Sequence, residues 1–241
     1  MKKIVLVAVL SLLLMNFALA NDPVAVLGIQ RGSDTRADLS TEGETTNAKA
    51  GNVTSLIINF TGITETWQGY YGNITGKIVL DNADNKSMYD WTVNSPTGNI
   101  FAVNESISDW SSVDCFNFTA SSPELNLSSL ESALGLDSSD ADGVDETFNT
   151  TTHATVYVGT NSFTNQCPAT KLYVDDGSST SFDNVLLYDP TTKNVIYTAV
   201  IYQDSTGFSN TNVDFQIIVG ENGHGSAAGT KTPYYFYFQL A

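Results

Sequence analysis

Alternation of apolar and polar residues constrains the fold of this chain more than any other feature of its sequence. It is clearest within residues 62–91, where Ile78 and Leu80 alternate with Lys77 and Asp81. Successive side chains of a strand point to opposite faces, so a period of two is typical of a half-buried β-strand. A turn-forming DNADN cluster follows, and MYDWTV begins the return. This stretch predicts two or three strands joined by tight turns.

Short apolar segments of the same kind recur along most of the chain, separated by turns rich in Gly, Asn and Asp. Many short strands at near-regular spacing favour an all-β protein. We expect an antiparallel two-sheet β-sandwich of about ten strands, immunoglobulin-like or jelly-roll-like. The predicted strands include residues 53–60, 99–103, 155–158, 182–188, 195–202, 213–219 and 234–240.

Only residues 122–134 favour a helix. Ser122 is suited to cap it, Pro123 suits its first position, and Gly135 is a typical stop. We expect this one short helix and the acidic loop after it to form an insert, residues 122–146, in the β-sandwich. Leucines spaced three and four residues apart give the helix a narrow apolar stripe of Leu127, Leu130 and Leu134.

The first 20 residues have the features of a secretory signal peptide. Lys2 and Lys3 are followed by an apolar run over residues 4–17 and by the small-residue sequence Ala-Leu-Ala. The apolar run is shorter than the roughly 20 residues that a transmembrane helix needs. We therefore expect residues 1–20 to be removed. The mature chain, from Asn21, would then have no membrane span and be secreted to the extracellular space or the cell surface.

The mature chain is expected to consist of an N-terminal segment and one large domain. Residues 21–50 contain a short apolar strand, at about 22–30, and a polar linker without periodicity. Residues 51–241 have a length suited to one β-sandwich domain, with a two-lobed body as the alternative.

The N-terminal strand is apolar on both faces, and strands of this kind are usually buried on both. One interpretation is an edge or first strand of the chain's own sheet. The other is a donor strand that completes the sheet of a neighbouring copy. Head-to-tail donation need not close and would build a filament. The residues expected to mediate this self-assembly are Val24, Val26, Leu27 and Ile29.

The chain is strongly acidic, with 26 Asp and Glu against 10 Lys and Arg and a formal net charge of −16. Loss of the two lysines of the signal peptide would change this charge to −18. Binding to nucleic-acid phosphates needs basic surface, so we expect no nucleic-acid partner. Any assembly of copies would need salt or divalent cations to screen the repulsion.

The densest acidic run lies at residues 137–146 and surrounds Gly143. Oxygen ligands at alternate positions around a glycine turn are what Ca²⁺ prefers, although the spacing is not that of an EF-hand. The alternative is a solvated acidic loop. Ca²⁺ is the one cofactor that the sequence suggests, and its candidate ligands are Asp140, Asp142, Asp145 and Glu146.

Two cysteines, Cys115 and Cys167, predict one disulfide bond, because paired cysteines of exported proteins are usually oxidised. A loop of this length would constrain the unfolded chain by about 4 kcal/mol in the entropic description. The alternative is a pair of metal ligands, for which no further soft ligand lies nearby in the sequence.

Eight Asn-x-Ser/Thr sequons occur in the chain. They mark surface positions for N-glycosylation if the producing cell glycosylates its secreted proteins. Chance is the alternative, because Asn, Ser and Thr are abundant. The sequon asparagines are Asn52, Asn59, Asn73, Asn85, Asn104, Asn117, Asn126 and Asn149.

Three aromatic residues, Trp67, Tyr70 and Tyr71, stand between glycines near the start of the strand-rich stretch. Exposed together, they would offer a surface for stacking on sugars or for contact with another protein. The alternative is that they belong to the core.

No catalytic motif is recognisable. The two histidines, His153 and His224, lack the spacing of a zinc site, and no Gly-x-Ser-x-Gly nucleophile motif occurs. Among 26 acidic residues, none is set in a context that marks the paired carboxylates of a glycosidase. We therefore expect that the protein is not an enzyme.

In outline the chain resembles secreted prokaryotic sandwich subunits of pili or matrix fibres, by architecture and compartment. We expect an extracellular structural or adhesive protein that associates with itself, or with other surface proteins, through its N-terminal strand. The alternatives are an extracellular glycan-binding or Ca²⁺-dependent adhesion module and, third, a polysaccharide hydrolase.

Overall fold

The structure is a computed structural model of the chain. The predicted signal peptide and Asn21 lie outside the residues that it describes. Within those residues the chain is mostly antiparallel β-structure with short helices, which confirms the all-β class. The described residues are 22–38, 43–120, 125–222 and 231–241.

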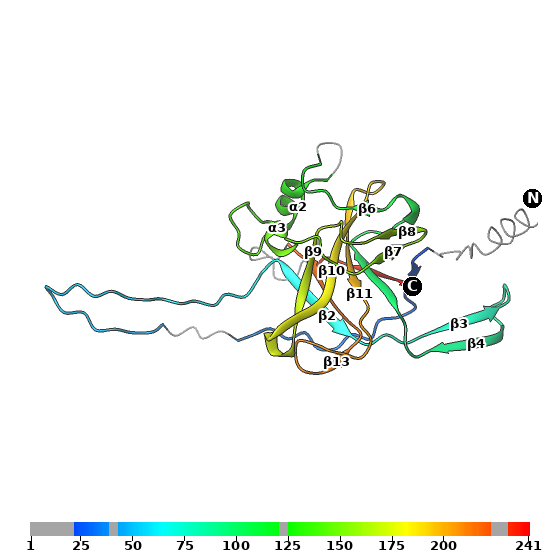
Figure 1. Ribbon diagram of the computed structural model, residues 1–241, viewed down its shortest axis with the longest axis horizontal. Coiled ribbons are helices and arrows are strands. Elements are labelled where there is room, and N and C mark those ends of the chain that lie inside the picture. The colour runs from blue at the N-terminus through cyan, green and yellow to red at the C-terminus, as the bar shows by residue number, and fades with distance from the viewer. Residues whose placement is uncertain (1–21, 39–42, 121–124, 223–230) are drawn as a thin grey trace, which may run out of the picture.

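A seven-stranded antiparallel sheet forms the centre of the molecule (Figure 1). Its strands are β1 (Val24–Ala25), β5 (Gly98–Val103), β6 (Asp114–Cys115), β9 (Ala169–Val174), β10 (Ser179–Asp189), β11 (Asn194–Val200) and β15 (Tyr235–Leu240). The order is β1-β15-β5-β11-β10-β6. β6 and β9 both pair with β10, along the edge that is not paired with β11. One sheet therefore combines strands from both halves of the chain.

The central strands of this sheet are buried on both faces. In β11, Ile196 packs into one apolar core, whereas Val195 and Tyr197 pack into the other. In β10, Leu187 and Leu186 divide between the two cores in the same way. Near-continuous apolar runs such as those of β10 and β11 are typical of strands that are covered from both sides.

A β-hairpin and a 3₁₀ turn cover one face of the sheet. The hairpin consists of β7 (Val156–Val158) and β8 (Asn161–Phe163), and the turn is η1 (Trp110–Ser112). The Trp110 ring packs against Phe101 of β5, with 5.2 Å between the ring centroids.

A strand pair and two helices cover the other face. The pair consists of β2 (Trp67–Gly72) and β14 (Phe215–Gly220), and the helices are α2 (Leu127–Leu134) and α3 (Val144–Thr147). The main sheet thus has a different cover on each face. A sandwich of two sheets, immunoglobulin-like or jelly-roll-like, is not confirmed.

The predicted helix is shorter than expected and is accompanied by a second one. α2 ends at Leu134, and Gly135 follows as the predicted stop, with a φ of 76° that glycine adopts easily. It begins at Leu127, because Asn126 is its cap and accepts a hydrogen bond from the Ser129 N–H at 2.9 Å. The predicted cap, Ser122, lies outside the described residues, and α3 occupies part of the predicted acidic loop.

In the part of the chain that the structure describes, no helix combines the length and hydropathy needed to cross a membrane.

Two further strand pairs complete the fold. β3 (Gly76–Asp81) and β4 (Ser87–Val93) form a hairpin that extends away from the main sheet (Figure 1). It confirms the hairpin predicted from the alternating pattern. The other pair is β12 (Ser205–Thr206) with β13 (Asn212–Val213), and a 3₁₀ turn, η2 (Asp175–Gly177), lies between β9 and β10.

The prediction of a strand at residues 53–60 is wrong. The segment is extended but pairs with no strand among the described residues. It belongs to an arm, residues 43–66, that leaves the body and returns to β2 (Figure 1). Alternating apolar residues favour an extended chain, but a strand also needs a partner for its backbone N–H and C=O groups.

Replacing Thr198 by valine is expected to stabilise the fold. Thr198 of β11 is 1% exposed, and its hydroxyl has no hydrogen-bond partner within the described part of the chain. A buried hydroxyl without a partner costs free energy, so the free energy of unfolding should rise by about 1 kcal/mol. Thermal unfolding followed by circular dichroism measures the change. Thr180→Val, at an exposed position of β10, is the matched control, and an unchanged or lower Tm for Thr198→Val would contradict the prediction.

Candidate functional site

Three carboxylates meet where α2 and α3 pack together. Glu131 of α2 and Asp145 and Glu146 of α3 have carboxylate oxygens within 4.8 Å of one another. Glu131 is only 5% exposed, and its Oε1 accepts a hydrogen bond from the Val144 backbone N–H at 3.4 Å. The cluster therefore sets one buried acidic group beside two more accessible ones.

Gly143, which precedes α3, leaves room for these carboxylates. A Cβ atom at this position would lie 2.3 Å from Oε2 of Glu146 and 3.2 Å from Oε1 of Glu131. The backbone oxygen of Asp140 would lie 3.2 Å from the same point. Carboxylate and carbonyl oxygens therefore converge around the glycine, and this donor set fits Ca²⁺.

Burial raises the pKa of Glu131 above its ordinary value. The N–H of Val144 acts in the opposite direction, and the neighbouring charges of Asp145 and Glu146 raise the pKa further. Ionised together, the three groups repel one another. A bound divalent cation would offset that repulsion.

Of the four acidic residues predicted as Ca²⁺ ligands, the structure brings Asp145 and Glu146 together. The other two carboxylates have different partners. Asp140 accepts a hydrogen bond from the Asp137 backbone N–H at 2.9 Å, and Asp142 accepts one from the Thr64 hydroxyl at 2.5 Å. Asp140 thus holds a local turn, Asp142 contacts the segment before β2, and neither side chain belongs to the cluster.

Sequence reasoning missed Glu131, although a signal for it exists. Leu127, Leu130, Glu131 and Leu134 follow the i, i+3, i+4, i+7 spacing of a helix face that is turned toward a core. A glutamate on such a face is rarely buried without a partner. It was therefore a candidate ligand within the predicted helix.

The three aromatic residues predicted as a contact surface do not lie together on the surface. The Trp67 ring packs on Phe148, with 5.7 Å between centroids, and its Nε1 donates to the backbone oxygen of Asp142 at 2.7 Å. Tyr70 packs edge-on against a ring of β15. Tyr71 alone of the three is exposed, at 55%, because neighbouring residues of a strand point to opposite faces.

The N-terminal strand lies on the chain's own sheet. β1 pairs antiparallel with β15, with Val24 opposite Phe238 and Ala25 opposite Tyr237. The strand has two residues and is therefore shorter than the predicted range of about 22–30. The four residues expected to mediate self-assembly remain exposed: Val24 (57%), Val26 (36%), Leu27 (107%) and Ile29 (61%).

The predicted disulfide between Cys115 and Cys167 is confirmed, with the two Cα atoms 4.9 Å apart. Cys115 ends β6, and Cys167 lies two residues before β9. The bond therefore joins the end of β6 to the segment just before β9.

His153 is engaged by the backbone and does not offer a metal site. It is 3% exposed, and its Nε2 accepts hydrogen bonds from the backbone N–H groups of Gln166 and Cys167, each at 3.2 Å. Its Nδ1 contacts the carbonyl oxygen of Ala154 at 2.7 Å. Both ring nitrogens are therefore occupied, and His224 lies outside the described residues.

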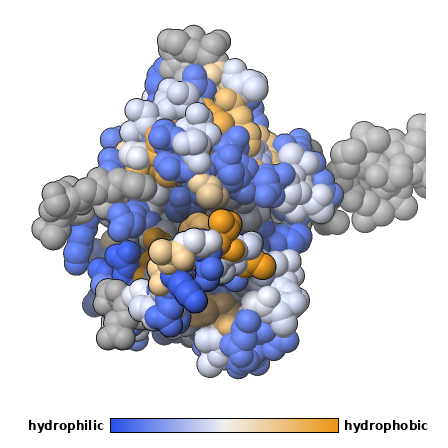
Figure 2. Space-filling view, turned by 90° about the vertical axis from the view of Figure 1, so that its left-hand side faces the viewer, coloured by the Kyte–Doolittle hydropathy of each residue, from blue (hydrophilic) through white to orange (hydrophobic). Residues whose placement is uncertain are grey.

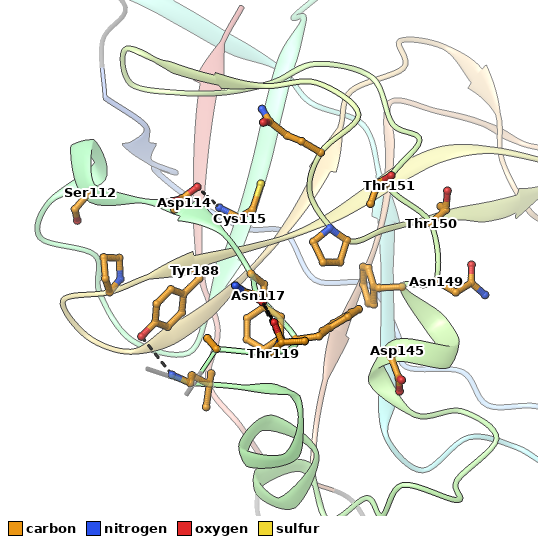
Figure 3. Close-up of a pocket in the computed structure, with 18 residues that line it drawn as sticks. Ser112, Asp114, Cys115, Asn117, Thr119, Asp145, Asn149, Thr150, Thr151 and Tyr188 are labelled. Atoms are coloured by element: carbon orange, nitrogen blue, oxygen red, sulfur yellow. Dashed lines mark hydrogen bonds between the residues drawn. The ribbon is translucent and has the colours of Figure 1, made fainter. Parts of the chain in front are cut away.

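An open depression of about 1200 Å³ lies beside β6 (Figure 3). Residues 112–120 line it from one side, and α3 with the segment after it lines it from another. Figure 3 shows Asp114 and Asp145 on opposite sides of this space. Its hydroxyl, amide and carboxylate groups suit a hydrated ligand better than an apolar one.

Seven of the eight sequon asparagines are exposed. The exception is Asn126, which is half-buried as the cap of α2. Two of the exposed ones, Asn117 and Asn149, line the depression (Figure 3). Glycans at these two positions would occupy it.

Replacing Glu131 by glutamine is expected to raise stability at neutral pH and to reduce its pH dependence. A carboxyl group whose pKa is raised on folding holds its proton more tightly in the folded state. Its contribution to stability is therefore present below the ordinary pKa of 4.5 and is lost as the pH rises through the folded pKa. Urea unfolding near pH 4.5 and at pH 7 measures this loss.

Glu105→Gln, which changes an exposed glutamate outside the cluster, is the matched control for this substitution. It should leave the pH dependence of the wild type in place. Equal loss of stability between the two pH values in the wild type and in Glu131→Gln would contradict the prediction.

Comparisons of this chain with protein-family models, with curated proteins and with solved structures found no match. Its function is therefore inferred from its own residues: the carboxylate cluster of α2 and α3, the N-terminal strand on β15, and the exposed apolar segments.

Proposed function

We propose that this protein is a secreted structural or adhesive subunit that self-associates outside the cell, with β1 as a strand donated to a neighbouring copy. The observation that carries the proposal is a short strand held at the outer edge of a sheet by a long tether. Secretion rests on the predicted signal peptide and agrees with the disulfide. Within this proposal the β2–β14 pair is the second layer of a sandwich, immunoglobulin-like or jelly-roll-like.

β1 makes few contacts with the body. Its two residues pair with β15, and the N–H of Val26 adds one hydrogen bond to the carbonyl oxygen of Phe236 at 3.3 Å. Val24 is more than half exposed, so the strand buries little apolar surface. Among the described residues before the arm, Pro23 is the buried one. Opening a segment with so few contacts costs little free energy.

The tether is long enough to reach a neighbour. Residues 26–66 separate β1 from β2, and their described parts, 26–38 and 43–66, contain no helix or strand. An extended chain spans about 3.3 Å per residue, so a tether of this length reaches on the order of 100 Å. A copy that receives β1 from a neighbour regains the same hydrogen bonds on β15 that its own β1 made.

Each copy then gives one strand and receives one. Such a head-to-tail contact need not close, so it produces a filament. The net charge, −16 for the full chain, opposes association, so we expect assembly to need salt or divalent cations. Other surface proteins with an open sheet edge are the alternative acceptors.

Removing the N-terminal strand is expected to abolish polymers. The mature chain, residues 21–241, should form filaments in salt, whereas a chain that begins at Gly32 should stay monomeric, because it has no strand to donate. Negative-stain electron microscopy and size-exclusion chromatography, with and without Ca²⁺, measure the difference.

A pair of proline variants makes the same test at full length. Val26→Pro removes the N–H that bonds to Phe236 and should weaken assembly. Thr35→Pro, at an exposed position beyond both the paired residues and the predicted range of about 22–30, should leave assembly unchanged. Monodisperse particles from the unmodified mature chain would overturn the proposal.

A second candidate function, a Ca²⁺-dependent adhesion module, is favoured by the cluster of Glu131, Asp145 and Glu146. Ca²⁺ should raise the Tm of the mature chain, because a ligand that binds only the folded state stabilises it. Glu131→Gln should abolish this shift, and Asp140→Asn should retain it, because Asp140 accepts a hydrogen bond outside the cluster. A Tm that does not change with Ca²⁺ would exclude a cation site here.

A further inference from the structure

The β3–β4 hairpin has one strongly apolar face. Ile78 lies opposite Trp91, and Leu80 lies opposite Tyr89. The rings of Tyr89 and Trp91 are in contact, with 4.8 Å between centroids. All four side chains remain exposed: Ile78 (49%), Leu80 (50%), Tyr89 (59%) and Trp91 (50%). This face is therefore open to solvent.

The hairpin also has two free edges. β3 and β4 pair only with each other among the described strands, so the outer N–H and C=O groups of both lack a strand partner. A two-stranded hairpin alone is at best marginally stable in water, and a third strand is usually needed. An exposed edge beside an apolar face is a ready template for an added strand.

Residues 53–60 complement the hairpin, because they are apolar, exposed and without a strand partner among the described residues. In the arm, Val53 is 102% exposed, Ile57 92%, Ile58 80% and Phe60 92%. Figure 2 looks onto the end from which the arm projects and shows hydrophobic side chains gathered in front of a largely hydrophilic face. In a strand, Leu56, Ile58 and Phe60 would share one face. The sequon residue Asn59 would point away from it.

The two features lie on opposite sides of the body. Figure 1 shows the arm extending to one side and the β3–β4 hairpin to the other. In this arrangement they do not meet within one copy. Copies placed head to tail bring the arm of one beside the hairpin of the next.

We propose that residues 53–60 of one copy add as a strand to a free edge of the β3–β4 hairpin of a second copy. The added strand gives the arm the backbone partner that it lacks and turns the hairpin into a three-stranded sheet. Leu56, Ile58 and Phe60 then extend the apolar face formed by Ile78 and Trp91. The inference rests on the proposed self-association but not on β1 being the donated strand.

Strand addition accounts for more of the exposed surface than the closest alternative. Two hairpins packed face to face would cover each other's aromatic side chains and form a closed dimer. That arrangement leaves residues 53–60 exposed and without a backbone partner. Addition of the arm to the hairpin covers the aromatic side chains and gives residues 53–60 a backbone partner in a single contact.

Variants of the mature chain, residues 21–241, test the contact from both sides. Ile58→Pro should weaken association about tenfold or more, because proline removes an N–H from the added strand. Thr46→Pro, in the same arm but outside the apolar segment, is the control. Trp91→Thr should have the same effect as Ile58→Pro, and Val79→Thr, on the opposite face of the hairpin, is its control. Sedimentation velocity at rising protein concentration measures association.

Mixing the two defective proteins gives the sharpest result. Ile58→Pro keeps an intact hairpin, and Trp91→Thr keeps an intact arm, so an equal mixture should contain dimers that neither protein forms alone. In wild-type assemblies, hydrogen exchange should slow at residues 53–60 and 76–93 relative to the monomer. The substituted residues are exposed, so each variant should keep the circular dichroism spectrum of the wild type.

The outcomes separate this inference from the proposed function. Loss of assembly in Val26→Pro, with Ile58→Pro assembling normally, would overturn the inference and leave β1 donation in place. Loss in Ile58→Pro, with Val26→Pro assembling normally, would support the inference and overturn donation of β1. A dimer that Ile58→Pro leaves unchanged would indicate hairpin-to-hairpin packing and would overturn the inference. A monomeric wild type would overturn both proposals.

Discussion

The fold depends on burying the central strands β5, β10 and β11 from both sides. Each of them sends alternate side chains into two separate cores, as Leu186 and Leu187 do in neighbouring positions. A fully buried side chain of this size contributes roughly 1.5–3 kcal/mol, so these strands, which are buried along most of their length, dominate the stability. Small elements such as α3, with four residues, form because the sheet gives them an apolar surface to cover.

Local patterns predicted those parts of the fold that local chemistry determines. The turn cluster between β3 and β4, the glycine that ends α2 and the single cysteine pair were all readable from the sequence. The partner of each strand was not, because pairing depends on residues far apart in the chain. Residues 53–60 show the limit: they have the alternation of a strand, but none of the strands in the described ranges pairs with them. For the same reason, the alternation in β3 predicted a half-buried strand, whereas every residue of β3 is exposed.

The candidate site was predictable in part. The acidic run around Gly143 indicated Asp145 and Glu146, but it indicated Asp140 and Asp142 equally. Short acidic side chains often accept hydrogen bonds from nearby backbone groups in turns, as Asp140 does here. Glu131 is brought to the cluster by the packing of α2 on α3, so its role follows from the tertiary structure. Tyr70 and Tyr71 similarly looked equivalent until β2 placed them on opposite faces.

The disulfide has a mechanical consequence when the proposed assembly is placed under tension. Tension applied along the backbone passes from Cys115 to Cys167 through the sulfur atoms and bypasses residues 116–166. The bypassed loop contains α2, α3 and the three clustered carboxylates. This part of the chain carries no direct load, so it can keep its shape, and any ion held there, while the arm and the outer strands are stretched.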